Sequence, residues 1–294
     1  MSMDSYDIKD DEILVLGMNL AKDPEVIHRG GTFVVVRWVI RIGLLLCIIV
    51  VCWFVAVAVR NYYRNQQELK GLEEIVRQDV PLYLAKSQLT YTFDAGDLND
   101  VPLHIYSVDN VAATLTMDET AIDSLSQADL VVAVLATDIR KDNLLPVGDF
   151  VVNGQRLSRG KSRLGYCAIL QGQISIGVSE DDAVMDYCLQ QGGSFFREYP
   201  LVMHGEICQN NVRGKKIRRA LVKQSNDIYV IESENRESLY DFSEALKDLG
   251  VETALNLPGG INFMMLKGDG IECERNRPEA GGNYLVFRPY HSVR

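Results

Sequence analysis

The stretch Ser238–Gly260 reads SLYDFSEALKDLGVETALNLPGG, and the rest of the chain can be interpreted outward from it. Its first half, Ser238–Leu249, carries apolar residues at helical spacing and stops at Gly250, which predicts an amphipathic helix. The apolar run Val251–Leu257 follows and predicts a strand that ends at Pro258-Gly259-Gly260. A helix that leads into a short strand and a glycine-rich turn is a common way to place a loop at the mouth of a site.

Short apolar runs of strand type fill much of the chain before this stretch. Leu103–Asp109 and Val111–Met117 alternate apolar and polar side chains, so both are predicted as strands. Leu130–Ala136 is continuously apolar, which predicts a buried central strand. The dipeptides Asn153-Gly154 and Gln171-Gly172 predict the turns of two hairpins.

Helices are few in this pattern, and they occur singly between strands. Asp118–Asp129 and Asp182–Gln191 are predicted as short helices. Because strands dominate and no tandem repeat is visible, the sequence predicts an α+β domain with a mixed, strongly twisted sheet. This fold class is favoured over a doubly wound parallel sheet, in which helices would alternate regularly with strands.

Composition sets limits on the class of protein. The chain has 294 residues, of which 47% are hydrophobic and 24% charged, as expected for a folded protein with one large or two small domains. The formal net charge is −10. A general nucleic-acid-binding role is therefore not expected, because attraction to phosphate backbones requires a basic face.

The cysteines and histidines do not predict a metal site or a cofactor. Cys47 and Cys52 lie in an apolar segment, whereas the other four cysteines are scattered without a CxxC spacing. No histidine pair has the helical spacing of metal ligands. Two alternatives remain open for the scattered cysteines: two disulfides, or four free thiols.

An apolar segment near the N-terminus predicts a single membrane span. Ile42–Val59 holds eighteen residues without a charge, and with Val39-Ile40 it is long enough to cross about 30 Å of hydrocarbon. Arginines flank it on both sides. We therefore divide the chain into an unstructured cytoplasmic tail (1–32) and a transmembrane helix (33–60).

The chain then continues as a predicted helical stalk (61–80) and a folded domain (81–294). Leu69, Leu72, Ile75 and Val76 recur at helical spacing in the stalk. This apolar stripe either packs on its own domain or supports weak self-association, and both alternatives remain open. Four basic residues precede the span and four follow it closely, so the positive-inside rule does not decide the orientation.

Four segments of the domain occur together in a recognisable order and spacing. They are Tyr199-Pro200-Leu201-Val202 after a glycine-rich lead, Arg218-Arg219-Ala220, the helix Leu239–Leu249, and Ala254–Gly260. In these segments the chain resembles the phosphodiester glycosidase family, the relatives of the lysosomal "uncovering enzyme" that removes N-acetylglucosamine from a sugar phosphodiester. The resemblance extends from about Pro102 to Arg288.

The resemblance implies a hydrolase in the cell (inner) membrane, with its C-terminal domain outside the cytoplasm, in the periplasm. The N-terminus is placed inside because the family acts on extracytoplasmic glycans. The expected partners are the lipid bilayer and a sugar phosphodiester or glycan, and no cofactor is expected.

The chain departs from the family at two polar positions. The family reads Asp-Gly-Gly at the terminal turn, where this chain has Pro258 in the Asp position. The family also carries an Asn motif after the buried strand, where this chain reads Ala136-Thr137-Asp138-Ile139-Arg140. The obvious acid/base carboxylate is therefore replaced.

The candidate site residues follow from these motifs. Arg218 occupies the motif position expected to bind phosphate, for which the planar guanidinium fork suits two oxygens. Gly259 and Gly260 would let the backbone approach a ligand, and Asn262 is a nearby polar side chain. All four are predicted to bind substrate.

A carboxylate is still needed to manage the proton in such a reaction. Asp138 follows the buried strand close to the family's Asn position and is the candidate catalytic residue. Glu198 and Glu252 are further options. Three functions remain open: a hydrolase, a catalytically inactive glycan-binding module of the same fold, and a structural membrane-tethered domain.

Overall fold

The computed structural model describes residues 24–77, 88–94, 101–125, 131–225, 227–268, 270–278 and 281–289. The chain divides into two compact units, with the boundary between Tyr63 and Arg64. Each unit is described by itself.

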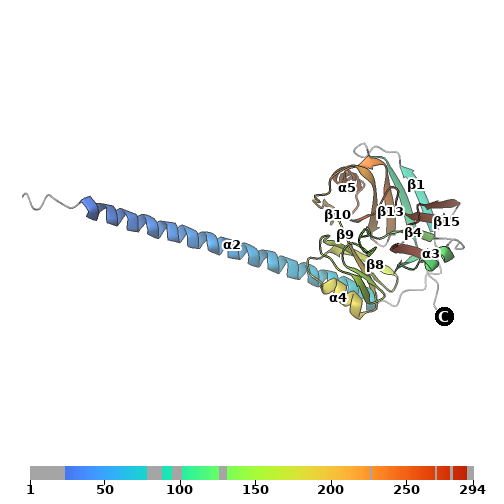
Figure 1. Ribbon diagram of the computed structural model, residues 1–294, viewed down its shortest axis with the longest axis horizontal. Helices are drawn as coiled ribbons and strands as arrows, with labels where there is room; N and C mark the ends of the chain where they lie inside the picture. The colour runs from blue at the N-terminus through green and yellow to red at the C-terminus, as the bar shows by residue number, and fades with distance from the viewer. Residues whose placement is uncertain are drawn as a thin grey trace, which may run out of the picture. The chain divides into compact units, whose positions relative to one another are not determined.

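The described part of the first unit is helical. Helix α2 runs from Pro24 to Arg77 and is, within the described residues, the one helix long and apolar enough to cross a membrane (Figure 1). Residues 36–60 are exposed along its whole circumference. The helix begins at Pro24 rather than at the predicted position 33, and proline is well tolerated in a first helical turn, where its missing N–H leaves no intrahelical bond unmade. Residues 1–23 of the predicted tail lie outside the described residues.

The second unit contains three sheets. The strands of the first are β1 Gln88–Asp94, β2 Leu103–Asp109, β10 Pro200–Met203, β11 Glu206–Ile207, β12 Lys216–Gln224, β13 Asp227–Glu237 and β14 Thr253–Leu257. They are ordered β1-β2-β13-β12-β14-β10-β11.

Two sheets of five strands complete the second unit. One contains β3 Val111–Thr116, β4 Val131–Leu135, β15 Met264–Gly268, β16 Ile271–Arg275 and β17 Tyr284–Pro289, in the order β16-β15-β4-β17-β3. The other contains β5 Phe150–Val152, β6 Gln155–Ser158, β7 Gly165–Leu170, β8 Gln173–Val178 and β9 Ser194–Glu198, in the order β6-β5-β9-β7-β8.

The predicted α+β class is confirmed, but the strand pairs between the described residues are antiparallel rather than mixed. Several neighbouring strands are joined by tight turns, which permit only antiparallel pairing. Asn153 and Gly154 have φ of 47° and 77°, as a type I′ turn requires, and Gln171 and Gly172 have 51° and 81°. Both predicted hairpins are therefore present.

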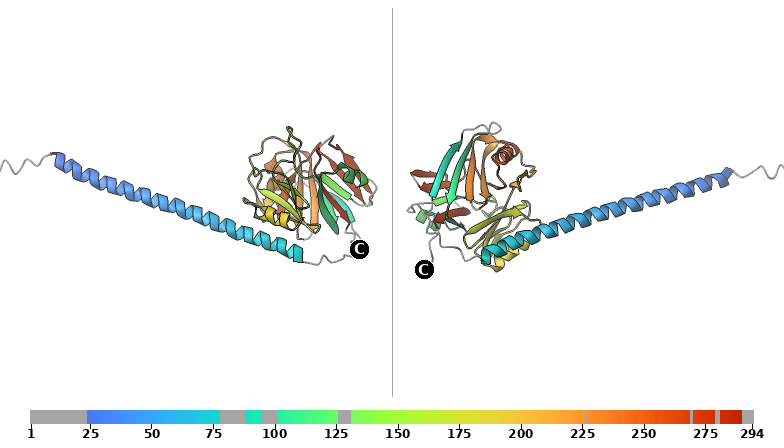
Figure 2. Two further views of the ribbon diagram at one scale, coloured as in Figure 1. Left: turned by 60° about the horizontal axis from the view of Figure 1, so that its bottom comes forward. Right: turned by 180° about the vertical axis from the view of Figure 1, so that it is seen from behind.

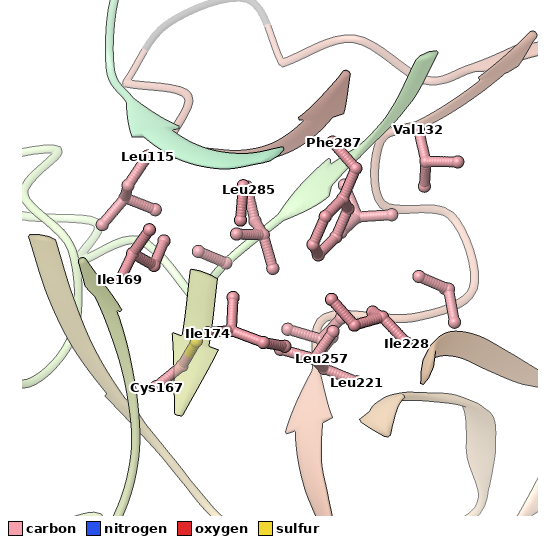
Figure 3. Packing of buried hydrophobic residues seen from close by; sticks show 14 of the residues in the cluster. Leu115, Val132, Cys167, Ile169, Ile174, Leu221, Ile228, Leu257, Leu285 and Phe287 are labelled. Atoms are coloured by element: carbon pink, nitrogen blue, oxygen red, sulfur yellow. The ribbon is translucent and has the colours of Figure 1, made fainter. Parts of the chain in front are cut away.

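The largest apolar cluster lies where the three sheets meet. It draws buried residues from each sheet, among them Leu221, Leu285 and Cys167, and Figure 3 shows these side chains converging. Val132 and Val134 of β4 are completely buried in this cluster. The prediction of a buried central strand over Leu130–Ala136 is thus confirmed for the described residues.

Each sheet has a second face, and helices cover it. Helix α5 (Leu239–Asp248) packs on the seven-stranded sheet, beside β10 and β13 (Figure 1). Its N-cap Ser238 accepts a hydrogen bond from the Asp241 amide at 3.0 Å, and Gly250 after its end has φ of 78°. Helix α3 (Glu119–Leu125) covers β4 and β17.

The last turns of α2 belong to the second unit. Leu72 is completely buried, and Leu69, Ile75 and Val76 pack around it against helix α4 (Ala183–Gln190) and the sheet of β7 and β9. Figure 2 shows α4 and this end of α2 side by side in both views. Of the two alternatives for the apolar stripe, the structure shows packing on its own domain. We call residues 64–76 the docked segment.

We predict that truncating Leu72 destabilises the domain. In a fragment comprising residues 64–294, Leu72→Ala should lower the free energy of unfolding by about 2–5 kcal/mol, because it leaves a cavity in a filled core. Gln66→Ala, on the exposed side of the same helix, should change it by less than about 0.5 kcal/mol. Urea unfolding measures both. Equal midpoints for the two variants would contradict the docked segment.

Candidate functional site

A buried carboxylate lies at the junction of two strands. Glu198 is the last residue of β9, its neighbour Tyr199 links β9 to β10, and the glutamate side chain is 0% exposed. A charge without water needs hydrogen-bonding partners from the protein itself, so its surroundings are expected to be polar.

Four groups bind the two carboxylate oxygens of Glu198. Oε1 accepts from the Arg163 guanidinium in a close ion pair and from the Thr137 hydroxyl at 2.9 Å. Oε2 accepts from the Tyr199 amide at 3.0 Å and from Asn256 Nδ2 at 3.2 Å. The carboxylate thereby joins four segments that are far apart in the sequence.

Arg163 connects this buried group to the surface. Its Nη2 pairs with Asp138 Oδ2 at 2.6 Å, and its guanidinium carbon lies 4.8 Å from the centre of the Tyr199 ring. The arginine side chain is 8% exposed, whereas that of Asp138 is 55% exposed. Asp138 is therefore a carboxylate open to a ligand, and one arginine links it to a buried carboxylate.

The end of strand β4 is fixed by a side-chain amide. The Thr137 amide donates to Asn283 Oδ1 at 2.8 Å, and Asn283 Nδ2 donates back to the Thr137 carbonyl at 3.0 Å. Asn283 is fully buried. These two hydrogen bonds resemble the pairing of a neighbouring strand and continue it past the end of β4. They fix the backbone at Thr137, the residue before Asp138.

Burial controls the charges of the site. It raises the pKa of Glu198 to about 7, although Arg163 and the other donors favour the ionised form. For Arg163, burial acts to lower the pKa, but the carboxylates of Glu198 and Asp138 outweigh it and the net direction is upward. Burial thus favours the neutral form of Glu198, whereas the neighbouring carboxylates keep Arg163 charged.

The structure places Arg218 on β12, where it takes part in none of these contacts. Its Nε donates to the Glu237 carbonyl at 2.9 Å and its Nη2 to the Gly214 carbonyl at 2.6 Å. Among the described residues no carboxylate pairs with it, and burial lowers its pKa. A buried cation held only by carbonyls would gain from an anionic ligand, and its predicted role in binding substrate stays a prediction.

The glycine-rich turn lies directly against β12. A Cβ on Gly259 would come within 2.6 Å of the Ile217 carbonyl oxygen, and Gly260 has φ of 68°. Close backbone packing at Gly259 and the left-handed conformation at Gly260 therefore favour glycine. Asn262 Nδ2 donates to the Gly259 carbonyl at 2.8 Å, which closes the turn. The turn and the backbone of Arg218 are neighbours, and ligand binding by Gly259, Gly260 and Asn262 stays a prediction.

Position 258 contributes only its backbone carbonyl, because proline has no carboxyl group. Arg219 Nη1 donates to the Pro258 carbonyl at 2.7 Å and to the Phe263 carbonyl at 3.0 Å. The same arginine pairs with Glu232 at 2.6 Å, and Glu232 also pairs with Arg275 at 2.7 Å. This buried ion network thus holds both ends of the glycine-rich turn through Arg219.

The sequence points to two members of this cluster, and their catalytic roles stay predictions. Asp138 was predicted and Glu198 was considered, whereas Arg163, Thr137 and Asn283 were not. The charged pair Arg197-Glu198 at the end of an otherwise apolar strand was the available signal for Glu198. Arg163 lies in a loop without periodicity, so nothing in the sequence pairs it with a residue 35 positions away.

The structure also bears on the cysteines and on possible metal ligands. All six cysteines are free, so the structure shows the thiol alternative rather than disulfides. In the part of the chain that the structure describes, no group of three or more His, Cys, Asp or Glu side chains could hold a metal ion.

Comparisons with known proteins give only distant similarity. No protein family and no curated protein matches the chain. Among solved structures, the catalytic domain of zebrafish N-acetylglucosamine-1-phosphodiester alpha-N-acetylglucosaminidase, auto-inhibited by its pro-peptide, is 14% identical with a TM-score of 0.47, over 70% of this chain and 83% of that one. A hypothetical protein from Synechocystis is 14% identical with a TM-score of 0.46, over 68% and 61%. Similarity at this level carries no information on activity.

We predict that Glu198 makes the stability of the domain fall as pH rises. Its native pKa of about 7 exceeds its usual value of 4.5, so the unfolded chain releases this proton first. The contribution of Glu198 is fully present below about pH 4.5 and is lost as pH rises through about 7. Between pH 4.5 and 8, the free energy of unfolding of the wild-type fragment 64–294 should fall by at least about 1 kcal/mol more than that of Glu198→Gln.

Urea unfolding at both pH values measures this difference, and groups common to both proteins cancel in it. The opposite sign, with Glu198→Gln losing more stability at the higher pH, would mean that the Arg163 ion pair outweighs burial.

Proposed function

We propose that this chain is a membrane-anchored hydrolase of the phosphodiester glycosidase type, acting on a sugar phosphodiester, with Asp138 as its acid/base. The observation that carries the proposal is the pairing of a half-exposed carboxylate, Asp138, with the buried pair Arg163 and Glu198 at the end of β4. The family-like motifs at Tyr199–Val202 and Ala254–Gly260 support it from the sequence.

The two carboxylates have different roles in this proposal. Asp138 is open enough to meet a substrate oxygen and to accept or donate a proton. Glu198 has no exposed surface, so it acts as a positioning residue: it holds Arg163, and Arg163 holds Asp138. Carboxylates in contrasting environments are a recurrent arrangement in enzymes that cleave glycosidic bonds.

Arg218 would bind the phosphate in the proposed site. Two of its nitrogens already donate to backbone carbonyls, which fixes the plane of the guanidinium. Nη1 makes no hydrogen bond with the described residues, so this nitrogen would meet a phosphate oxygen. The backbone at Gly259 and Gly260 and the amide of Asn262 would line the same side of the ligand.

A glycan-binding module without activity is the second candidate, and Pro258 favours it. The Pro258 carbonyl accepts a hydrogen bond from Arg219, and proline has no carboxyl group. A protein that kept Arg218 and the glycine-rich turn but lost this carboxylate would still hold a phosphoglycan. In both candidates α2 anchors the protein in the cell membrane, with the domain outside the cytoplasm.

The test is a pair of matched substitutions in the full-length chain in lipid nanodiscs. The substrate is the methyl phosphodiester of N-acetylglucosamine 1-phosphate, and release of N-acetylglucosamine is measured. Asp138→Asn should lower the rate at least about 100-fold, since it removes the acid/base group. Asp142→Asn, an exposed carboxylate four residues later, should leave the rate unchanged.

Two results would contradict the proposed reaction. Equal rates for wild type and Asp138→Asn would remove Asp138 from the chemistry. If the wild type releases no sugar but binds the probe in calorimetry, the binding module is favoured instead. That binding should weaken in Arg218→Lys, which keeps the charge but loses the planar fork, and not in the exposed control Arg213→Lys.

A further inference from the structure

Two loops around the site are joined to each other along their length. Residues 139–146 follow Asp138, and residues 159–164 contain Arg163 and lead to strand β7. Arg140 Nη2 donates to the Arg159 carbonyl at 3.1 Å, and the Ser158 hydroxyl donates to the Pro146 carbonyl at 2.6 Å. With the Asp138–Arg163 ion pair, these bonds make one surface, which we call the paired loops.

The paired loops expose leucines to solvent. Leu144 is 48% exposed, Leu145 37% and Leu164 40%. Leu164 is exposed although both of its neighbours, Arg163 and Gly165, are buried. Leu144 also has φ of 58°, a left-handed conformation that is rare for a bulky residue and is kept only where the surroundings impose it.

The same surface is basic, in contrast to the chain as a whole. Between Asp138 and Leu164 the two loop regions 138–148 and 158–164 hold five cations and two carboxylates, whereas the chain has a net charge of −10. The cations are Arg140, Lys141, Arg159, Lys161 and Arg163. Arg163 is buried in its ion pairs with Asp138 and Glu198, and Lys161 pairs with Asp182 at 2.9 Å. Arg140, Lys141 and Arg159 have no carboxylate partner among the described residues. Exposed leucines among lysines and arginines are the composition of a membrane-surface element.

Within the domain, the docked segment begins on the side of the paired loops. In the docked segment, Glu68 accepts from the Tyr166 hydroxyl at 3.1 Å, and the Val76 carbonyl accepts from Gln171 at 3.4 Å. The segment therefore starts beside the first residues of β7, which directly follow residues 159–164. Only four residues lie between Val59 and Arg64, and the five steps from one to the other reach at most about 18 Å when fully extended.

We infer that the paired loops form a contact surface for an anionic phospholipid bilayer. The leucines enter the boundary between headgroups and acyl chains, and the three cations Arg140, Lys141 and Arg159 meet the phosphate groups. A protein partner fits less well, because the paired loops contain no aromatic residue, and aromatic anchors dominate protein–protein interfaces. This inference does not depend on whether the site hydrolyses anything.

The test is hydrogen exchange of the full-length chain in two kinds of nanodisc. One contains only phosphatidylcholine, and the other contains phosphatidylcholine and phosphatidylglycerol. Backbone amides of residues 139–146 and 159–164 should exchange at least about threefold more slowly in the anionic disc. Peptides from residues 206–215, which are also a polar loop with exposed cations, should exchange equally in both.

Matched substitutions separate lipid contact from other causes. Leu144→Ser with Leu164→Ser, and separately Lys141→Glu with Arg159→Glu, should each abolish the difference between discs. Tyr240→Ser and Lys216→Glu, which change an exposed aromatic and an exposed cation elsewhere, should preserve it. Equal exchange of the paired loops in both discs, or a difference that survives both double substitutions, would overturn the inference.

Discussion

The ion pair between Glu198 and Arg163 is the constraint on which the site depends. A fully buried carboxylate is costly unless its oxygens accept hydrogen bonds. Here the donors come from Thr137 just after β4, the Tyr199 amide between β9 and β10, strand β14 and the loop before β7. Any rearrangement of one of these segments would leave a charge unpaired in a dry environment. The buried Glu198 thus fixes Arg163, and Arg163 in turn fixes Asp138 at the surface.

Buried ion pairs between an arginine and a carboxylate also occur elsewhere in the domain. Asp149 pairs with Arg197 at 2.8 Å, and Glu232 pairs with Arg219 at 2.6 Å, each in a buried setting. Buried pairs of this kind add little net stability compared with apolar packing, but a mispaired alternative leaves a charge exposed to an apolar interior. Arg219 and Glu232 lie opposite each other on β12 and β13, so a shift in the register of these two strands would separate this buried pair.

The sequence predicted most of the elements and only the outer part of the site. The helix Leu239–Asp248, the hairpins and the buried strand β4 follow from periodicity and turn residues, which are local properties. The antiparallel pairing and the docking of α2 against α4 are not local, so the pattern left them open. Asp138 was recognisable after a buried strand, whereas its link to Glu198 passes through Arg163, whose loop carries no pattern.

The central claim is that Glu198 and Arg163 act as one unit, and a double-mutant cycle on the fragment 64–294 tests it most directly. Glu198→Gln and Arg163→Met are made singly and together, and unfolding free energies are measured at pH 8. Each single change leaves one buried polar group without its partner, so the double variant should be more stable than the sum predicts by at least about 2 kcal/mol. Effects that add within about 0.5 kcal/mol would contradict the claim.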